Sequence, residues 1–85
     1  LKRYHNSGEI NSTVTNTNAI MQKIKAAYSD GDINELDGIT ITYPDYWFNL
    51  RPSNTEPKLR LTLEAKSAQR MQEKQDEVLA LIRNK

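Results

Sequence analysis

Residues 39–64 contain three segments in which apolar and polar side chains alternate, joined by short turns. The segments cover 39–43, 46–50 and 58–64. Strict alternation is typical of a strand with one buried face, and short turns join antiparallel neighbours. This part of the chain therefore predicts an antiparallel sheet with one apolar face and one polar face.

Further elements flank this sheet on both sides. Residues 9–14 alternate more weakly and predict a short strand. Apolar residues at helical spacing predict a helix over 18–28, ended near Gly31, which suits a left-handed C-terminal cap. Ser67 can cap a second helix near the C-terminus. The predicted fold class is α+β: a mainly antiparallel four-stranded sheet with two helices packed on one face, in the order β-α-β-β-β-α.

Length and composition limit what such a domain can do. The 85 residues allow one small core and no deep cleft between two domains. A net charge of +1, from 12 Lys+Arg and 11 Asp+Glu, excludes a strongly basic nucleic-acid binder. Without cysteine there is no thiolate metal site, and no apolar run approaches the length of a membrane helix. We expect a cytoplasmic protein with no membrane partner, in which residues 1–8 are a linker or hinge remnant and residues 9–85 form the domain.

The segment 51–57 carries the polar groups best suited to bind an anion. Arg51 offers a planar, permanently charged fork that can bind a phosphate through two nitrogens. Ser53 and Thr55 add hydroxyl donors and Asn54 adds an amide donor. Backbone N–H groups of a tight turn can converge on the same anion. The segment is chemically suited to hold a phosphate or a carboxylate, although a plain solvated turn would have a similar composition.

Prolines and charged neighbours modify this interpretation. Pro52 and Pro57 bracket the loop, and their fixed φ lowers the entropy cost of holding its shape. Glu56 would repel a phosphate unless it points outward or pairs with Lys58 or Arg60. Arg60 lies on the polar face of the next predicted strand, where it either supports the loop or is solvated.

The run from Asn49 to Leu61, NLRPSNTEPKLRL, resembles the phosphate-binding loop of the α-D-phosphohexomutases. The similarity is closest to the bacterial phosphomannomutase/phosphoglucomutase branch of that family. Flanking residues agree, because Ser7 to Asn11 resembles the start of the family's C-terminal domain and Asp37-Gly38 precedes the expected strand. The resemblance covers essentially the whole chain and implies that it is the fourth domain of such an enzyme.

The resemblance implies a division of labour among four domains around one cleft. A phosphoserine in the first domain transfers the phosphoryl group, three aspartates in the second hold Mg²⁺, and the third selects the sugar. The fourth holds the phosphate that is not reacting. Carried over by position, the phosphate contacts would be Arg51, Ser53, Asn54 and Thr55, and the residues that shape or support the loop would be Pro52, Pro57 and Arg60.

The same resemblance implies what this chain would lack and need. It would have no catalytic residue, no metal and no cofactor of its own, so the isolated chain would be inactive. Its partners would be a mannose or glucose phosphate and the other three domains, with no nucleic acid. The sugar preference does not follow from this chain.

Two features could suggest a metal or catalytic site, and both have simpler explanations. Asp30-Gly31-Asp32 holds two aspartates at the predicted end of a helix, where a capping turn explains them better than Mg²⁺, which needs several oxygen ligands. His5 is the single histidine and there is no cysteine, so we interpret it as a solvated linker residue.

A function from a different class stays open, namely a small RNA- or protein-binding α+β module that uses the polar sheet face. Trp47, Lys58 and Arg60 would lie on that face, and single strands stack on aromatic side chains above positive charge. The small net charge and the absence of regularly spaced aromatics on neighbouring strands argue against this alternative.

Overall fold

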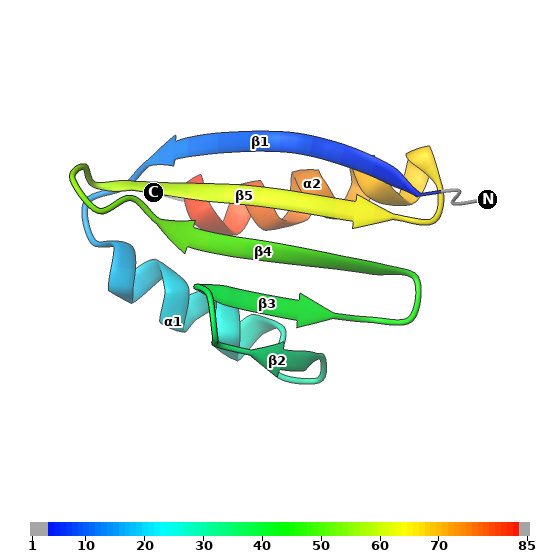
Figure 1. The fold of residues 1–85 in the computed structure, drawn as a ribbon, viewed down its shortest axis with the longest axis horizontal. Helices are drawn as coiled ribbons and strands as arrows, with labels where there is room; N and C mark the ends of the chain where they lie inside the picture. The colour runs from blue at the N-terminus through cyan, green and yellow to red at the C-terminus, as the bar shows by residue number, and fades with distance from the viewer. Residues whose placement is uncertain (1–3, 84–85) are drawn as a thin grey trace.

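The computed structural model describes residues 4–83, and within them the chain forms one sheet and two helices. The elements are β1 (His5–Thr13), α1 (Thr17–Ala27), β2 (Asp32–Asn34), β3 (Ile39–Thr42), β4 (Tyr46–Pro52), β5 (Lys58–Ala65) and α2 (Ala68–Arg83). The sheet order is β1-β5-β4-β3-β2, and all neighbours are antiparallel. Both helices lie on the same side of the sheet (Figure 1). The predicted α+β class and the placement of the helices are confirmed.

The sheet has five strands where the sequence predicts four. The additional strand, β2, pairs with β3 in a register that sets Ile33 opposite Ile41. Its three residues include a single apolar side chain, so no alternating pattern marks it. Pairing with β3, in which Ile33 meets a partner eight positions further along the chain, makes the segment a strand.

Gly31 does not form the left-handed helix cap that the sequence predicts, because its φ lies outside the positive region. The helix ends with Tyr28 as its C-cap. A Cβ atom on Gly31 would lie 2.6 Å from a methyl carbon of Ile41 and 2.9 Å from the ring of Tyr43. Glycine is required here by the close approach of the chain to β3, and not by backbone conformation.

The first strand begins four residues earlier than predicted, because Ser7 and Gly8 form a β-bulge in the pairing with β5. Gly8 has a φ of +74°, and the Ser7 hydroxyl accepts a hydrogen bond from the backbone N–H of Leu63 at 3.0 Å. A bulge of this kind lets pairing continue on both sides. A hinge role for residues 1–8 in a longer chain stays a prediction, and residues 1–3 lie outside the described part.

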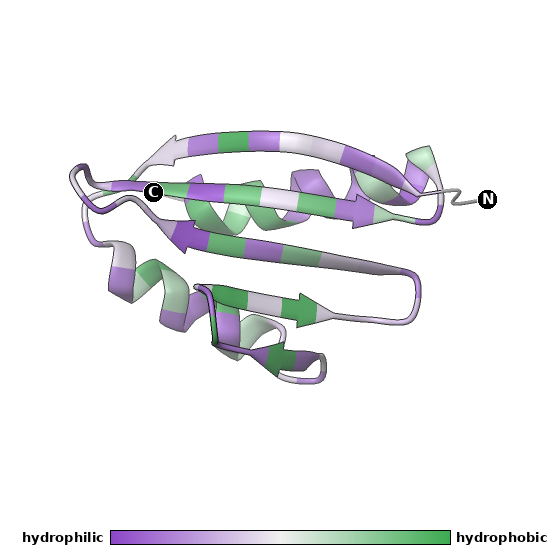
Figure 2. Cartoon of the chain, in the orientation of Figure 1, coloured by the Kyte–Doolittle hydropathy of each residue, from purple (hydrophilic) through white to green (hydrophobic). Residues whose placement is uncertain are grey.

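The core lies between the sheet and the two helices. Alternating side chains of the strands point into it, and Figure 2 shows the alternation as green and purple bands along β4 and β5. The largest fully buried side chains are Phe48, Ile24, Ile41, Leu50, Leu59, Leu61, Leu63 and Val78. Each such side chain contributes roughly 1.5–3 kcal/mol when it is buried. The opposite face of the sheet carries mainly polar residues, together with Trp47.

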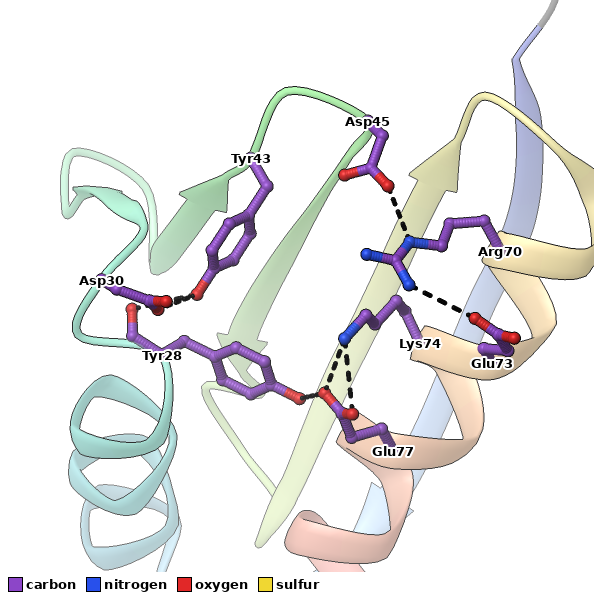
Figure 3. A network of polar contacts seen from close by, with 8 residues as sticks. All are labelled: Tyr28, Asp30, Tyr43, Asp45, Arg70, Glu73, Lys74 and Glu77. Carbon is purple, nitrogen blue, oxygen red and sulfur yellow. Dashed lines mark hydrogen bonds and ion pairs between the residues drawn. The ribbon is translucent and has the colours of Figure 1, made fainter.

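Polar contacts connect the two helices to each other and to the sheet (Figure 3). The hydroxyl of Tyr28, at the end of α1, donates to Glu77 of α2 at 2.6 Å. Lys74 lies 3.3 Å from the same carboxylate oxygen. The hydroxyl of Tyr43 donates to Asp30 at 2.6 Å. These contacts fix the C-terminal end of α1 against both α2 and the end of β3.

Arg70 connects α2 to the turn between β3 and β4 (Figure 3). Its Nε atom lies 2.7 Å from the Asp45 carboxylate and its Nη1 atom 3.3 Å from Glu73. The cationic groups of Arg70 and Lys74 lie 5.6 and 5.3 Å from the centre of the Tyr46 ring. At these distances a cation is attracted to the face of an aromatic ring.

Burial and these contacts shift pKa values in the network, among them those of Tyr28, Tyr46 and Glu77. Burial first, and then the hydrogen bond to Glu77, raises the pKa of Tyr28 well above its ordinary value of 10.0. Burial raises the pKa of Tyr46 to about 12. The hydrogen bond from Tyr28 lowers the pKa of Glu77 below its ordinary value of 4.5. The shifts arise from packing and from partners inside the network, so we interpret it as a structural support.

Replacing Tyr28 tests the support, because Tyr28→Phe removes the hydroxyl donor and keeps the ring. At pH 7 we expect the variant to lose about 1 kcal/mol of unfolding free energy, since Glu77 is 49% exposed and water can replace the donor. A carboxyl whose folded pKa is lowered stabilises the fold above its unfolded pKa and loses that effect as the pH falls through the folded value. The difference between the two proteins should therefore shrink in acid.

Urea unfolding of both proteins at about pH 7 and pH 3 measures this difference. A loss of the same size at both pH values would show that ionised Glu77 is not the partner that matters.

Candidate functional site

Two arginines lie side by side on the open face of the sheet. Arg51 in β4 is directly opposite Arg60 in β5. The alternation that buries Leu50 and Leu61 turns both arginines to the face away from the helices. Like charges at directly opposed positions destabilise a sheet unless opposite charge lies nearby. In the structure the carboxylates of Asp37 and Glu9 supply such charge, at 3.2 Å from Arg51 and 4.0 Å from Arg60.

The two arginines border a polar pocket at the end of the sheet where β4 turns into β5. The pocket has a volume of about 340 Å³, within the lower part of the range for small-molecule sites. Its lining residues, which define the arginine pocket, are Asp37, Gly38, Arg51, Pro52, Ser53, Asn54 and Arg60. Five of the seven residues predicted from the sequence line this pocket, namely Arg51, Pro52, Ser53, Asn54 and Arg60. The structure therefore brings most of the predicted residues together.

Thr55 and Pro57 belong to the same loop but do not line the arginine pocket. Thr55 is exposed, and its backbone N–H donates to the Ser53 hydroxyl oxygen at 3.4 Å. The carbonyl of Pro57 accepts a hydrogen bond from the N–H of Val14 at 2.8 Å, which ties the loop to the connection after β1. A direct phosphate contact from Thr55 stays a prediction.

Short backbone hydrogen bonds close the loop between β4 and β5. The N–H of Ser53 donates to the carbonyl of Lys58 at 2.9 Å, and the N–H of Lys58 donates to the carbonyl of Glu56 at 2.8 Å. The side chains of Lys58 and Glu56 pair at 3.4 Å. Glu56 lies outside the lining of the arginine pocket. Its pair with Lys58 is one of the arrangements in which, by the sequence analysis, Glu56 would not repel a phosphate.

Asp37 and Gly38 complete the arginine pocket from the loop between β2 and β3. The Asp37 carboxylate lies 3.2 Å from Nη1 of Arg51. The side-chain amide of Asn49 donates to the Asp37 carbonyl at 2.9 Å and so holds this loop against β4. Gly38 has a φ of +68°, and a Cβ atom there would lie 2.5 Å from the carbonyl oxygen of Leu50. In the sequence, the Asp-Gly pair marks a strand start and gives no sign of this contact.

The open face has little uncompensated positive charge among the described residues. Trp47 lies opposite Glu64, and its indole N–H donates to that carboxylate at 3.1 Å. Lys58 and Arg60 each lie beside a glutamate, at 3.4 and 4.0 Å. Nucleic-acid affinity comes mainly from cations that neutralise phosphates. This arrangement therefore does not favour the RNA-binding alternative.

The aspartates and the histidine that could suggest a metal or catalytic site have structural or solvent-exposed positions in the described residues. No group of three or more His, Cys, Asp or Glu side chains gathers there as a metal would require. Asp30 accepts the Tyr43 hydroxyl, and Asp32 belongs to β2. His5 is exposed in β1, opposite Ala65. Neither helix in this part of the chain is long and apolar enough to cross a membrane.

The chain matches the family described as "Phosphoglucomutase/phosphomannomutase, C-terminal domain" over residues 9–81. It is 52% identical over 80 residues to the phosphomannomutase of Methanocaldococcus jannaschii, covering 94% of this chain and 18% of that protein. It is 42% identical over 80 residues to a phosphomannomutase of Escherichia coli, covering 91% and 18%. A probable phosphoglucosamine mutase of Methanopyrus kandleri is 39% identical over 61 residues, covering 72% and 13%. The chain spans less than a fifth of the length of these relatives.

Gly8 and Gly38 both have a positive φ, but only Gly38 lies close against the backbone of β4. Comparing alanine variants at the two positions therefore separates the cost of the close contact from the cost of the backbone conformation. Gly8 and Gly38 have φ values of +74° and +68°, but a Cβ atom has open space at Gly8 and meets the Leu50 carbonyl at Gly38. We expect Gly8→Ala to lower the unfolding free energy by roughly 1–2 kcal/mol, the cost of the left-handed conformation. Gly38→Ala should cost more, because a backbone carbonyl in a central strand cannot move aside.

Urea unfolding of both variants measures the two losses. Equal losses would contradict the conclusion that the close approach of Gly38 to the Leu50 carbonyl leaves no room for a side chain.

Proposed function

Because this chain belongs to the phosphoglucomutase/phosphomannomutase family as its C-terminal domain, we propose that its arginine pocket binds the phosphate group of a hexose phosphate. The observation that carries the proposal is the pair of opposed arginines, Arg51 and Arg60, at the rim of a polar pocket. Guanidinium groups bind phosphate oxygens through charge-assisted hydrogen bonds. Ser53 and Asn54, also in the lining, add neutral donors.

The proposed role is to hold the phosphate that is not reacting while phosphoryl transfer takes place in another domain of a longer chain. Interconversion of hexose 1-phosphate and hexose 6-phosphate requires one phosphate to be held while the other end of the sugar reacts. Arg51 would neutralise the phosphate charge and fix its orientation. The loop is already closed by hydrogen bonds of Ser53 and Lys58, so little additional ordering is needed on binding. Holding the substrate in this way contributes to catalysis through positioning.

The proposal assigns the chemistry and the metal to other parts of the complete enzyme. We propose that this chain alone is inactive and that Mg²⁺ in the complete enzyme is held by another domain. The proposed partners are mannose or glucose phosphates and the other three domains. The cytoplasmic location expected from the sequence stays a prediction.

Replacing Arg51 tests the site directly. An amide-resolved NMR titration with glucose 1-phosphate should shift resonances of residues 51–54, with a Kd in the millimolar range, about −4 kcal/mol. Arg51→Ala should weaken binding by at least about tenfold, since charge-assisted hydrogen bonds contribute roughly 1.5–3 kcal/mol. The fold should survive, because the Arg51 side chain is 41% exposed.

Lys66→Ala is the matched control. It removes one positive charge directly after β5, at the end of the sheet away from the pocket, and should leave the affinity unchanged. Free glucose should cause no shifts. Undiminished affinity in folded Arg51→Ala would contradict the site assignment. Binding of a single-stranded RNA that falls steeply with salt would instead support the nucleic-acid alternative.

A further inference from the structure

We propose that Asp37 is a displaceable internal ligand of Arg51, which keeps the guanidinium oriented in the arginine pocket and gives way when a phosphate binds. The inference rests on the proposed function and extends the site to a residue of a different loop. Asp37 would be a positioning residue, because it acts through Arg51.

The geometry places the Asp37 carboxylate on the guanidinium that the proposal assigns to the phosphate. Nη1 of Arg51 lies 3.2 Å from one Asp37 oxygen and 3.5 Å from the other. Both side chains line the same pocket. Nη1 carries two of the five N–H donors of the guanidinium. A phosphate that binds through Nη1 either shares this nitrogen with the Asp37 carboxylate or displaces it, so the two acceptors compete at Nη1.

The backbone around Asp37 is held firmly, although its side chain is free to move. The Asn49 amide donates to the Asp37 carbonyl at 2.9 Å and to the Ile39 carbonyl at 3.4 Å. Gly38 lies close against the backbone of Leu50. The Asp37 side chain, in contrast, is 76% exposed. It can rotate into solvent while the loop that carries it stays in place.

The strength of the ion pair is suited to exchange. Exposed ion pairs contribute little to stability, and the Arg51 side chain is 41% exposed as well. A phosphate carries more charge and more acceptor oxygens than a carboxylate, so it is the stronger partner for the guanidinium. The second arginine, Arg60, lies 4.0 Å from Glu9, a looser pair. An incoming phosphate therefore meets two cations whose present partners are weakly held.

Asp37 has two opposing effects on phosphate binding, and its variants separate them. Its hydrogen bond orients Arg51, which favours binding, and its negative charge competes with the phosphate, which opposes it. Asp37→Asn keeps an oxygen acceptor and removes the charge. Asp37→Ala removes both. The asparagine variant should therefore bind phosphate more tightly than the unaltered chain and more tightly than the alanine variant.

The test is a titration of the unaltered chain, Asp37→Asn, Asp37→Ala and Asp32→Asn with inorganic phosphate and with glucose 1-phosphate. We expect Asp37→Asn to bind each about three- to fivefold more tightly, a gain that shrinks as salt is added. Asp32→Asn makes the same change in net charge, but Asp32 lies in β2 opposite Thr42, at the other end of β3. Its affinity should stay within twofold of the unaltered chain.

The outcomes distinguish this inference from the proposed function. If the unaltered chain binds phosphate through Arg51 but Asp37→Asn binds no more tightly, the inference is overturned and the proposed function stands. An equal gain in Asp32→Asn would also overturn it, because the effect would then be one of net charge. If neither the unaltered chain nor Asp37→Asn binds, the proposed function and the inference both fail. Urea unfolding of each variant checks that it is folded.

Discussion

Burial of one face of the β4–β5 hairpin determines both the core and the candidate site. Leu50 of β4 and Leu61 of β5 are opposite each other and at most 1% exposed. Because side chains alternate along a strand, the register that buries this pair also places Arg51 opposite Arg60 on the other face. A slip of one residue would bury an arginine and expose a leucine. The hydrophobic core therefore fixes the two cations that face the proposed ligand.

The fold could be predicted where its signals are local. Alternation over residues 39–64 marks three strands without knowledge of any distant contact. Ser67 caps α2 as predicted, because its hydroxyl oxygen accepts a hydrogen bond from the Arg70 N–H at 3.0 Å. The missed features depend on partners. β2 exists because it pairs with β3, and the early start of β1 depends on a bulge against β5. Gly31 illustrates the difference, since the neighbour that requires glycine there is ten positions away.

The residues of the candidate site also fall into those that the sequence identifies and one that only the structure reveals. Arg51, Ser53 and Asn54 lie within one short loop, so residue chemistry and the family resemblance identify them together. Asp37 lies fourteen positions before Arg51 and reaches it only because β3 lies beside β4. No local pattern relates the two residues. A sequence can therefore indicate the groups that attract an anion more readily than the group that competes with it.

The position of the arginine pocket has a mechanical consequence. The chain enters β1 opposite Ala65, at one end of β5 (Figure 1). The pocket is lined by Arg60 and by the start of the loop between β4 and β5, toward the other end of β5. A strand rises about 3.3 Å per residue, so β5 separates the two points by about 20 Å. Because the strands are hydrogen-bonded and packed against the helices, the sheet would move as one rigid body over that distance. A rotation of about 10° at the start of β1 would sweep the pocket through roughly 3–4 Å, about the length of one hydrogen bond. A rotation of the domain about the start of β1 would therefore be large enough to make or break a contact at the pocket.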